Sequence, residues 1–116
     1  MFEIEARDRD HYAVFRITGE IGLADAVDFT HRMQELLASH PASQYLLDLN
    51  QVSRMDNAGL GVLVSLSTSL QGRGRRFVLL QPRPHVMQLL GNAHIESFFP
   101  TCDSEAELKR FGKAAQ

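Results

Sequence analysis

The sequence predicts a single α/β domain with a mostly parallel, mixed sheet of about five strands covered by about four helices. Short apolar runs alternate along the chain with longer segments of helical period, which is typical of parallel strands joined by helical connections. The length of 116 residues and the hydrophobic content of 44% suit one core-forming domain over residues 1–116.

The first two strands are expected to form an antiparallel pair. Residues 2–6 alternate apolar and polar side chains, and a polar turn at residues 8–11 follows them. Residues 12–18 are rich in β-forming side chains and predict the second strand. Val14 would lie on one of its faces, and the residues expected on the other face are Ala13, Phe15 and Ile17.

A helix, a buried strand and a second helix are predicted next. Residues 23–37 have apolar side chains at helical spacing, and Pro41 prevents the helix from continuing. Residues 45–49 are almost wholly apolar, which predicts a strand buried on both faces. A short loop and a turn then lead into a helix over residues 59–70. The apolar positions of the first helix are Leu23, Ala26, Val27, Phe29, Met33, Leu36 and Leu37, and those of the second are Leu60, Val62, Leu63, Leu66 and Leu70.

The C-terminal third is expected to add two strands and two helices. Residues 77–80 form a short apolar run, and Pro82 and Pro84 open a helix that Gly91–Asn92 closes. Residues 98–99 predict a final short strand. A last helix would begin at Asp103 or Ser104, with inward-facing Ala106, Leu108 and Phe111.

Charge and composition exclude several classes of partner. The net charge is -2, from 12 basic and 14 acidic residues, so the chain has no electrostatic footprint for nucleic acid or an anionic membrane. No apolar stretch reaches the ~18 residues of a membrane helix, and no signal peptide is recognisable. We therefore expect a soluble, cytoplasmic domain without direct membrane insertion. One dense basic cluster fits a solvated loop better than a phosphate site; it contains Arg73, Arg75, Arg76 and Arg83.

No pattern of catalytic or metal-binding residues stands out. The single cysteine, Cys102, cannot form an intrachain disulfide and has no neighbouring metal-ligand spacing. The five histidines are scattered along the chain, and neither a Walker-type phosphate loop nor a nucleophile elbow is present. We expect a protein that is not an enzyme and that holds no metal and no cofactor.

The stretch from Leu46 to Leu63 is the most informative part of the chain. It contains the turn Asp56-Asn57-Ala58-Gly59 between the buried strand and the following helix. This stretch resembles the central motif of STAS domains, the fold of bacterial anti-sigma factor antagonists. Two further segments support the resemblance over the whole chain: Val14–Ile21 looks like the family's second strand, and Phe98–Ala106 looks like its last strand and helix start.

The resemblance implies a protein-binding module whose usual phosphorylation switch is missing. The family turn typically reads Asp-Ser-Ser-Gly or Asp-Ser-Thr-Gly, and its second hydroxyl residue accepts phosphate from a partner kinase. Here Ala58 stands at that position, and a methyl group cannot accept phosphate. Gly22 stands where family members commonly have an aspartate that assists phosphotransfer. Ser53 remains as a fallback acceptor on the preceding loop.

Two residues of the turn also have ordinary structural interpretations. Asp56 matches the family's aspartate, and it is equally a good helix N-cap. Gly59 matches the family's glycine, where it would let a partner backbone approach, and it equally suits tight packing of helix against sheet. Leu60 and Val62 are the apolar candidates for docking if they are exposed.

The expected partner is an anti-sigma factor with a GHKL-type serine kinase fold. The binding surface would consist of the Arg54–Gly59 turn, the start of the following helix and the Gly19–Leu23 loop. An alternative is a structural STAS subunit of a lipid-trafficking ABC transporter or of a signalling scaffold, and a small-molecule-binding module ranks last. Self-association is left open. The candidate partner-binding residues are Gly22, Arg54, Asp56, Asn57, Ala58, Gly59 and Leu60.

Overall fold

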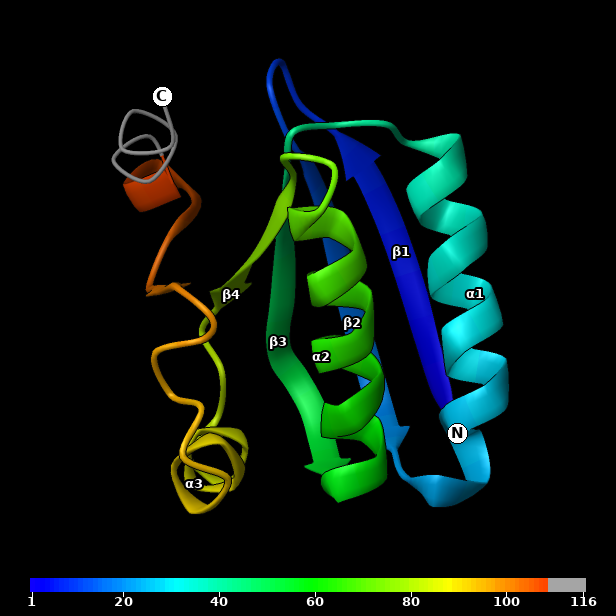
Figure 1. The fold of residues 1–116 in the computed structure, drawn as a ribbon, viewed down its shortest axis with the longest axis vertical. Coiled ribbons are helices and arrows are strands. Elements are labelled where there is room, and N and C mark those ends of the chain that lie inside the picture. The colour runs from blue at the N-terminus through cyan, green and yellow to red at the C-terminus, as the bar shows by residue number, and fades with distance from the viewer. Residues whose placement is uncertain (109–116) are drawn as a thin grey trace.

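A computed structural model describes residues 1–108 of the chain as a five-stranded mixed sheet with helices packed on it (Figure 1). The strands lie in the order β1-β2-β3-β4-β5; β1 is antiparallel to β2, and every later pair is parallel. The predicted fold class is confirmed. The elements are β1 (Phe2–Asp8), β2 (Ala13–Ile21), the 3₁₀ turn η1 (Leu23–Asp25), α1 (Ala26–Ser39), β3 (Gln44–Met55), α2 (Asn57–Gln71), β4 (Arg76–Leu80), α3 (Pro84–Asn92), β5 (Thr101–Cys102) and the 3₁₀ turn η2 (Glu105–Glu107).

The main core lies between one face of the sheet and the three α-helices. As predicted, Ala13, Phe15 and Ile17 of β2 point into this core, where they meet buried residues of all three helices. In α1 the buried side chains are Phe29, Met33 and Leu36, which recur at helical spacing. Burial of this apolar surface is the main source of the fold's stability.

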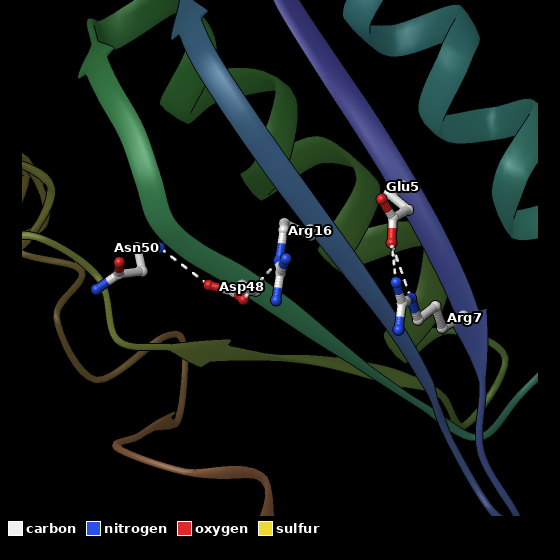
Figure 2. Close-up of polar contacts among 5 residues, drawn as sticks. All are labelled: Glu5, Arg7, Arg16, Asp48 and Asn50. Carbon is white, nitrogen blue, oxygen red and sulfur yellow. Dashed lines mark hydrogen bonds and ion pairs between the residues drawn. The ribbon is translucent and has the colours of Figure 1, made fainter.

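The opposite face of the sheet is part apolar and part polar. A smaller cluster covers its middle and contains Val14, Leu46, Val78, Leu80, Cys102 and Leu108. Towards β1 the face carries charges: Arg16 Nε donates to Asp48 Oδ2 at 3.3 Å, and the Asn50 N–H donates to Asp48 Oδ1 at 3.1 Å (Figure 2). On β1 itself, Arg7 pairs with Glu5. The buried-strand prediction for residues 45–49 is confirmed, since all five are buried.

β3 is longer than the sequence predicted. The expected loop after Leu49 is wrong, because Asn50–Met55 continue the strand beside the end of β2, where Glu20 pairs with Arg54 and Ile21 with Met55. Two register shifts between β2 and β3, each with one extra residue on β3, accommodate this pairing. The polar side chains after Leu49 lie on solvent-exposed positions, so the apolar run ends while the backbone ladder continues.

The C-terminal predictions need two corrections. The last strand is at Thr101–Cys102 and not at Phe98–Phe99, because hydrophobic burial draws the Phe99 ring into the main core from the turn that precedes the strand. Ala106, expected to face inward, is exposed, whereas Leu108 is buried. Residues 1–108 contain three α-helices and the 3₁₀ turns η1 and η2. The turn η2 begins after Ser104, where the last helix was expected to start, and the rest of that predicted helix, with Phe111, lies outside the described residues.

Candidate functional site

The turn that begins α2 is held by the carboxylate of Asp56. Its backbone is extended at the N-cap position, and Oδ1 accepts hydrogen bonds from the N–H groups of Ala58 at 2.9 Å and Gly59 at 3.1 Å. The first N–H groups of a helix have no intrahelical partner, so this carboxylate satisfies two of them. The helix-cap interpretation of Asp56 is confirmed.

The same carboxylate joins α2 to the loop after β2. Its second oxygen, Oδ2, accepts a hydrogen bond from the Leu23 N–H at 3.0 Å. A Cβ atom at Gly22 would lie 3.1 Å from this oxygen, so the absence of a side chain there lets the loop approach Asp56 closely. The two segments that the sequence singled out, the Arg54–Gly59 turn and the Gly19–Leu23 loop, therefore meet at Asp56.

Hydrogen bonding keeps the carboxylates of this region ionised. The Gly59 N–H, and with it the N–H groups of Leu23 and Ala58 and the charge of Arg54, lower the pKa of Asp56 below its ordinary value of 3.8. An ion pair with the N-terminal ammonium, at 2.8 Å, and a hydrogen bond from the Gly22 N–H lower the pKa of Asp25. At neutral pH the site therefore carries negative charge beside a helix N-terminus.

Gly59 serves the packing of this chain on itself. A Cβ atom there would collide with the backbone carbonyl oxygen of Ile21, and the residue is buried. The tight-packing interpretation of Gly59 is confirmed. Because its backbone is covered by β2, this glycine leaves no room for a partner backbone to approach at the same point.

The residues of the turn differ in their accessibility. Arg54 and Asn57 are exposed, and Ala58 is half-buried. Leu60, proposed from sequence as an apolar docking residue, is only 4% exposed and packs in the main core. Val62 is half-buried and packs against the same core. The interpretation of Leu60 as a docking residue is wrong, because its position on α2 faces the sheet.

The exposed apolar side chains at this end belong instead to η1 and the start of α1. Leu23 is 76% exposed and Val27 is 67% exposed. The sequence pattern counted both residues with the apolar face of the helix. The sequence contained a signal against that assignment, because the buried face of α1 includes Phe29 and Met33. Val27 lies two residues before Phe29, which is about 200° around an ideal helix and therefore close to the opposite face.

Ser53 and the arginine cluster take ordinary structural roles. Ser53 is exposed on β3, and its hydroxyl donates to the Gly19 carbonyl at 3.2 Å. Arg76 donates to the Gln44 side chain at the start of β4, whereas Arg83 follows the end of that strand. The structure therefore does not gather the arginines of the sequence cluster into one patch.

Several features bear on other kinds of chemistry. Burial raises the pKa of the Cys102 thiol to about 11, which makes it a poor nucleophile at neutral pH. In the described part of the chain, no three His, Cys, Asp or Glu side chains gather in a way that could hold a metal ion.

Among residues 1–108, none of the helices combines the length and apolar character needed to cross a bilayer. An open groove lies between β1 and α1, lined in part by Phe2, Ile4, Asp28 and His31.

Comparison with known proteins gives a consistent result. The family model described as the STAS domain matches residues 3–108. The anti-sigma-B factor antagonist of Listeria monocytogenes is 36% identical over 80 residues, which cover 66% of this chain and 66% of that protein, just under two thirds of its length. The expectation of a non-enzymatic protein agrees with this relative, which by name is an antagonist of another protein.

Solved structures share the fold at lower sequence identity. The protein TM1081 of Thermotoga maritima superposes with a TM-score of 0.82 at 20% identity, covering 92% of both chains. The anti-sigma factor antagonist SpoIIAA, in its unphosphorylated form, superposes with a TM-score of 0.75 at 18% identity, covering 97% of both chains. At these identities the superpositions establish the shared architecture, and the site residues carry the functional argument.

Proposed function

This chain belongs to the STAS domain family, and we propose that it is an anti-sigma factor antagonist that binds a GHKL-type serine kinase anti-sigma factor in the cytoplasm. In this proposal residues 1–116 act as one domain and as a regulatory binding module. The docking surface consists of the Arg54–Gly59 turn, the start of α2 and the loop that ends at Leu23.

The observation that carries this proposal is the triple use of the Asp56 carboxylate. It binds the N–H groups of Ala58, Gly59 and Leu23, so two segments far apart in sequence form one ordered surface. A surface that is ordered before binding loses less conformational entropy when a partner docks. Such preorganisation suits a module whose function is recognition.

We further propose that docking at this turn is not reversed by phosphorylation of residue 58. The Ala58 side chain is a methyl group with no oxygen to accept a phosphoryl group, and its N–H is already bonded to Asp56. In a phosphorylatable turn, the added charge of about -1.5 to -2 would oppose docking. Without that charge, the extent of binding would follow the concentrations of the two proteins and their competitors.

A charge-mimicking variant tests the proposal. Ala58→Asp places a carboxylate in the first turn of α2, where the helix dipole tolerates it, so the fold is expected to survive. We expect the native chain to bind a purified GHKL-type anti-sigma factor from its own genome and Ala58→Asp to bind at least ~10-fold more weakly. The measurement is isothermal titration calorimetry.

The control is Ser65→Asp, which adds the same charge at an exposed position two turns further along α2. It is expected to bind like the native chain. If no GHKL-type protein binds and the native chain instead copurifies with a transporter ATPase, unaffected by Ala58→Asp, the antagonist proposal is wrong. That result would favour the structural subunit of a lipid-trafficking ABC transporter or scaffold, for which a missing phosphoacceptor is no obstacle.

A further inference from the structure

We propose that Leu23 and Val27 form the apolar anchor of the docking surface, and that this anchor inserts into an apolar pocket of the partner that is bordered by basic side chains. The inference rests on the proposed function and adds to it the residues that supply the binding energy. It also gives the chemistry of the partner surface. We call Leu23 and Val27 together the η1 anchor.

Exposure singles out the η1 anchor from the rest of the described surface. Leu23 is 76% exposed and Val27 is 67% exposed, whereas the next large hydrophobic residue, leaving aside the terminal Met1, is Met87 at 38%. Leu23 begins η1 and Val27 lies in the first turn of α1, so both exposed side chains belong to the same short segment at this end of the molecule. Exposed apolar residues that are grouped in this way mark binding surfaces more often than single ones do.

The η1 anchor lies at the candidate site and is held there. The Leu23 N–H donates to Asp56, which in turn caps α2, so the backbone under Leu23 cannot move independently of the Arg54–Gly59 turn. Figure 1 shows that α1 and α2 begin at the same end of the molecule. A partner that covers the half-buried Ala58 would thus also reach the η1 anchor.

The charges around the η1 anchor select the kind of partner. Asp28, directly after Val27, is exposed, and Asp25 and Asp56 are carboxylates whose lowered pKa keeps them ionised. The nearby cations are Arg54, which interacts with Asp56, the N-terminal ammonium, which pairs with Asp25, and Arg32, which lies one turn after Asp28 and lines the same groove. The carboxylates of Asp25, Asp28 and Asp56 therefore surround the anchor with acidic side chains. A second copy of this chain would bring like charges together, whereas a partner with basic side chains around an apolar pocket would complement them.

The test measures affinity for each GHKL-type anti-sigma factor of the source genome, purified singly and titrated by calorimetry against the full chain. Leu23→Ser and Val27→Ser are each expected to weaken binding by at least ~10-fold, because a buried apolar anchor contributes most of its energy through desolvation. The matched control is Met87→Ser on α3, which is expected to change the affinity by less than ~2-fold. Circular dichroism confirms that each variant is folded.

A charge variant tests the second half of the inference. Asp28→Lys is expected to slow association, and the effect is expected to shrink as NaCl is raised from about 50 to about 500 mM, since salt screens exposed charges. His31→Lys, which adds a cation one turn further along α1, should slow association less because it leaves the carboxylate in place.

The outcomes separate this inference from the proposed function. If the native chain binds a GHKL-type protein, and Ala58→Asp weakens binding while Leu23→Ser and Val27→Ser do not, the proposed function stands and the anchor is wrong. If no GHKL-type protein binds the native chain, both fall. A dimer in sedimentation velocity that Leu23→Ser converts to monomer would assign the η1 anchor to self-association and would overturn the inference.

Discussion

At the scale of single residues, Asp56 has more consequences than any other side chain of the site. One carboxylate caps α2 through two N–H groups and holds the loop at Leu23 through a third. Its neighbours Gly22 and Gly59 are glycines because each lies against another part of the chain, the Asp56 carboxylate in one case and the Ile21 carbonyl in the other. Glycine is therefore favoured at these two positions because neighbouring atoms lie so close that they leave little room for a side chain.

The lowered pKa of Asp56 predicts how the contribution of this residue to the stability of the fold depends on pH. When the pKa of a carboxyl group is lower in the folded than in the unfolded protein, its ionised form stabilises the fold. This stabilisation is complete at pH values above the unfolded-state pKa and is lost as the pH falls through the folded-state pKa. We therefore expect the stability difference between the native chain and Asp56→Asn to be constant above about pH 5 and to shrink below about pH 4. Urea unfolding at several pH values measures it. A difference that stays constant down to pH 2 would contradict this account.

Two glycines of α2 predict opposite effects of the same substitution. Gly59→Ala would force a methyl group against the Ile21 carbonyl, and we expect a loss of about 1–3 kcal/mol in the free energy of unfolding. Gly61→Ala is the matched control, because a Cβ atom there meets nothing within 4 Å. It is expected to stabilise α2 by about 0.5–1 kcal/mol. Equal effects of the two variants would show that Ile21 does not lie against Gly59.

At the scale of elements, the spacing of hydrophobic residues predicted the buried segments correctly. It did not predict the strand segment whose side chains are mostly polar. The buried run at residues 45–49 identified the centre of β3, whereas Asn50–Met55 gave no strand signal because the partner strand, and not their own side chains, keeps them extended. Similarly, Phe98–Phe99 suggested a strand, although the pairing with β4 begins only at Pro100. Tertiary pairing of this kind cannot be derived from local composition.

The candidate site was predicted more completely than its exposed surface. The turn and its cap followed from Asp56, and the meeting of this turn with the Gly19–Leu23 loop agreed with the family resemblance. The exposure of Leu23 and the burial of Leu60 depend on how α1 and α2 rotate about their axes. That rotation is decided by the packing of the whole core, which a single helix pattern does not determine.

The hydroxyl groups of two tyrosines join separate elements through hydrogen bonds. Removing each hydroxyl is expected to lower the free energy of unfolding by a different amount. The Tyr12 hydroxyl donates to Glu105 at 2.8 Å, which ties the β1–β2 turn to η2. Tyr12→Phe is expected to cost about 1 kcal/mol, since both groups are partly solvated and can bond to water instead. Tyr45→Phe should cost more, about 2–3 kcal/mol, because the buried Tyr45 hydroxyl pairs with the His40 carbonyl and the Ala42 N–H. Chemical denaturation measures both, and the reverse order would contradict these contacts.

At the scale of the whole molecule, the sheet has two unequal faces. The three α-helices of residues 1–108 pack on one face, while the other combines a small apolar cluster with the exposed charges of β1 and β2. The proposed docking surface lies on the helical side, at the end where α1 and α2 begin. The charged face of β1 and β2 keeps this part of the sheet well solvated.

The two apolar clusters share one sheet, which predicts a single unfolding transition. We expect urea denaturation of the full chain, followed by circular dichroism and by tyrosine fluorescence, to give coincident two-state curves with an m-value of about 1–3 kcal/mol/M. Tyrosine fluorescence combines Tyr45 in the main core with Tyr12 beside the smaller cluster, whereas circular dichroism follows the helices and strands. Separate midpoints for the two signals would mean that residues 1–116 do not fold as a single domain.

The closeness of Gly22 to Asp56 also constrains how this protein can change over evolutionary time. Any side chain at residue 22 begins 3.1 Å from the Asp56 carboxylate, and an acidic one would add charge repulsion. A chain that acquired an aspartate there would first have to release Asp56 from the Leu23 N–H. Among close homologues that keep Asp56, we therefore expect a side chain at residue 22 to occur only together with a rearranged Gly19–Leu23 loop.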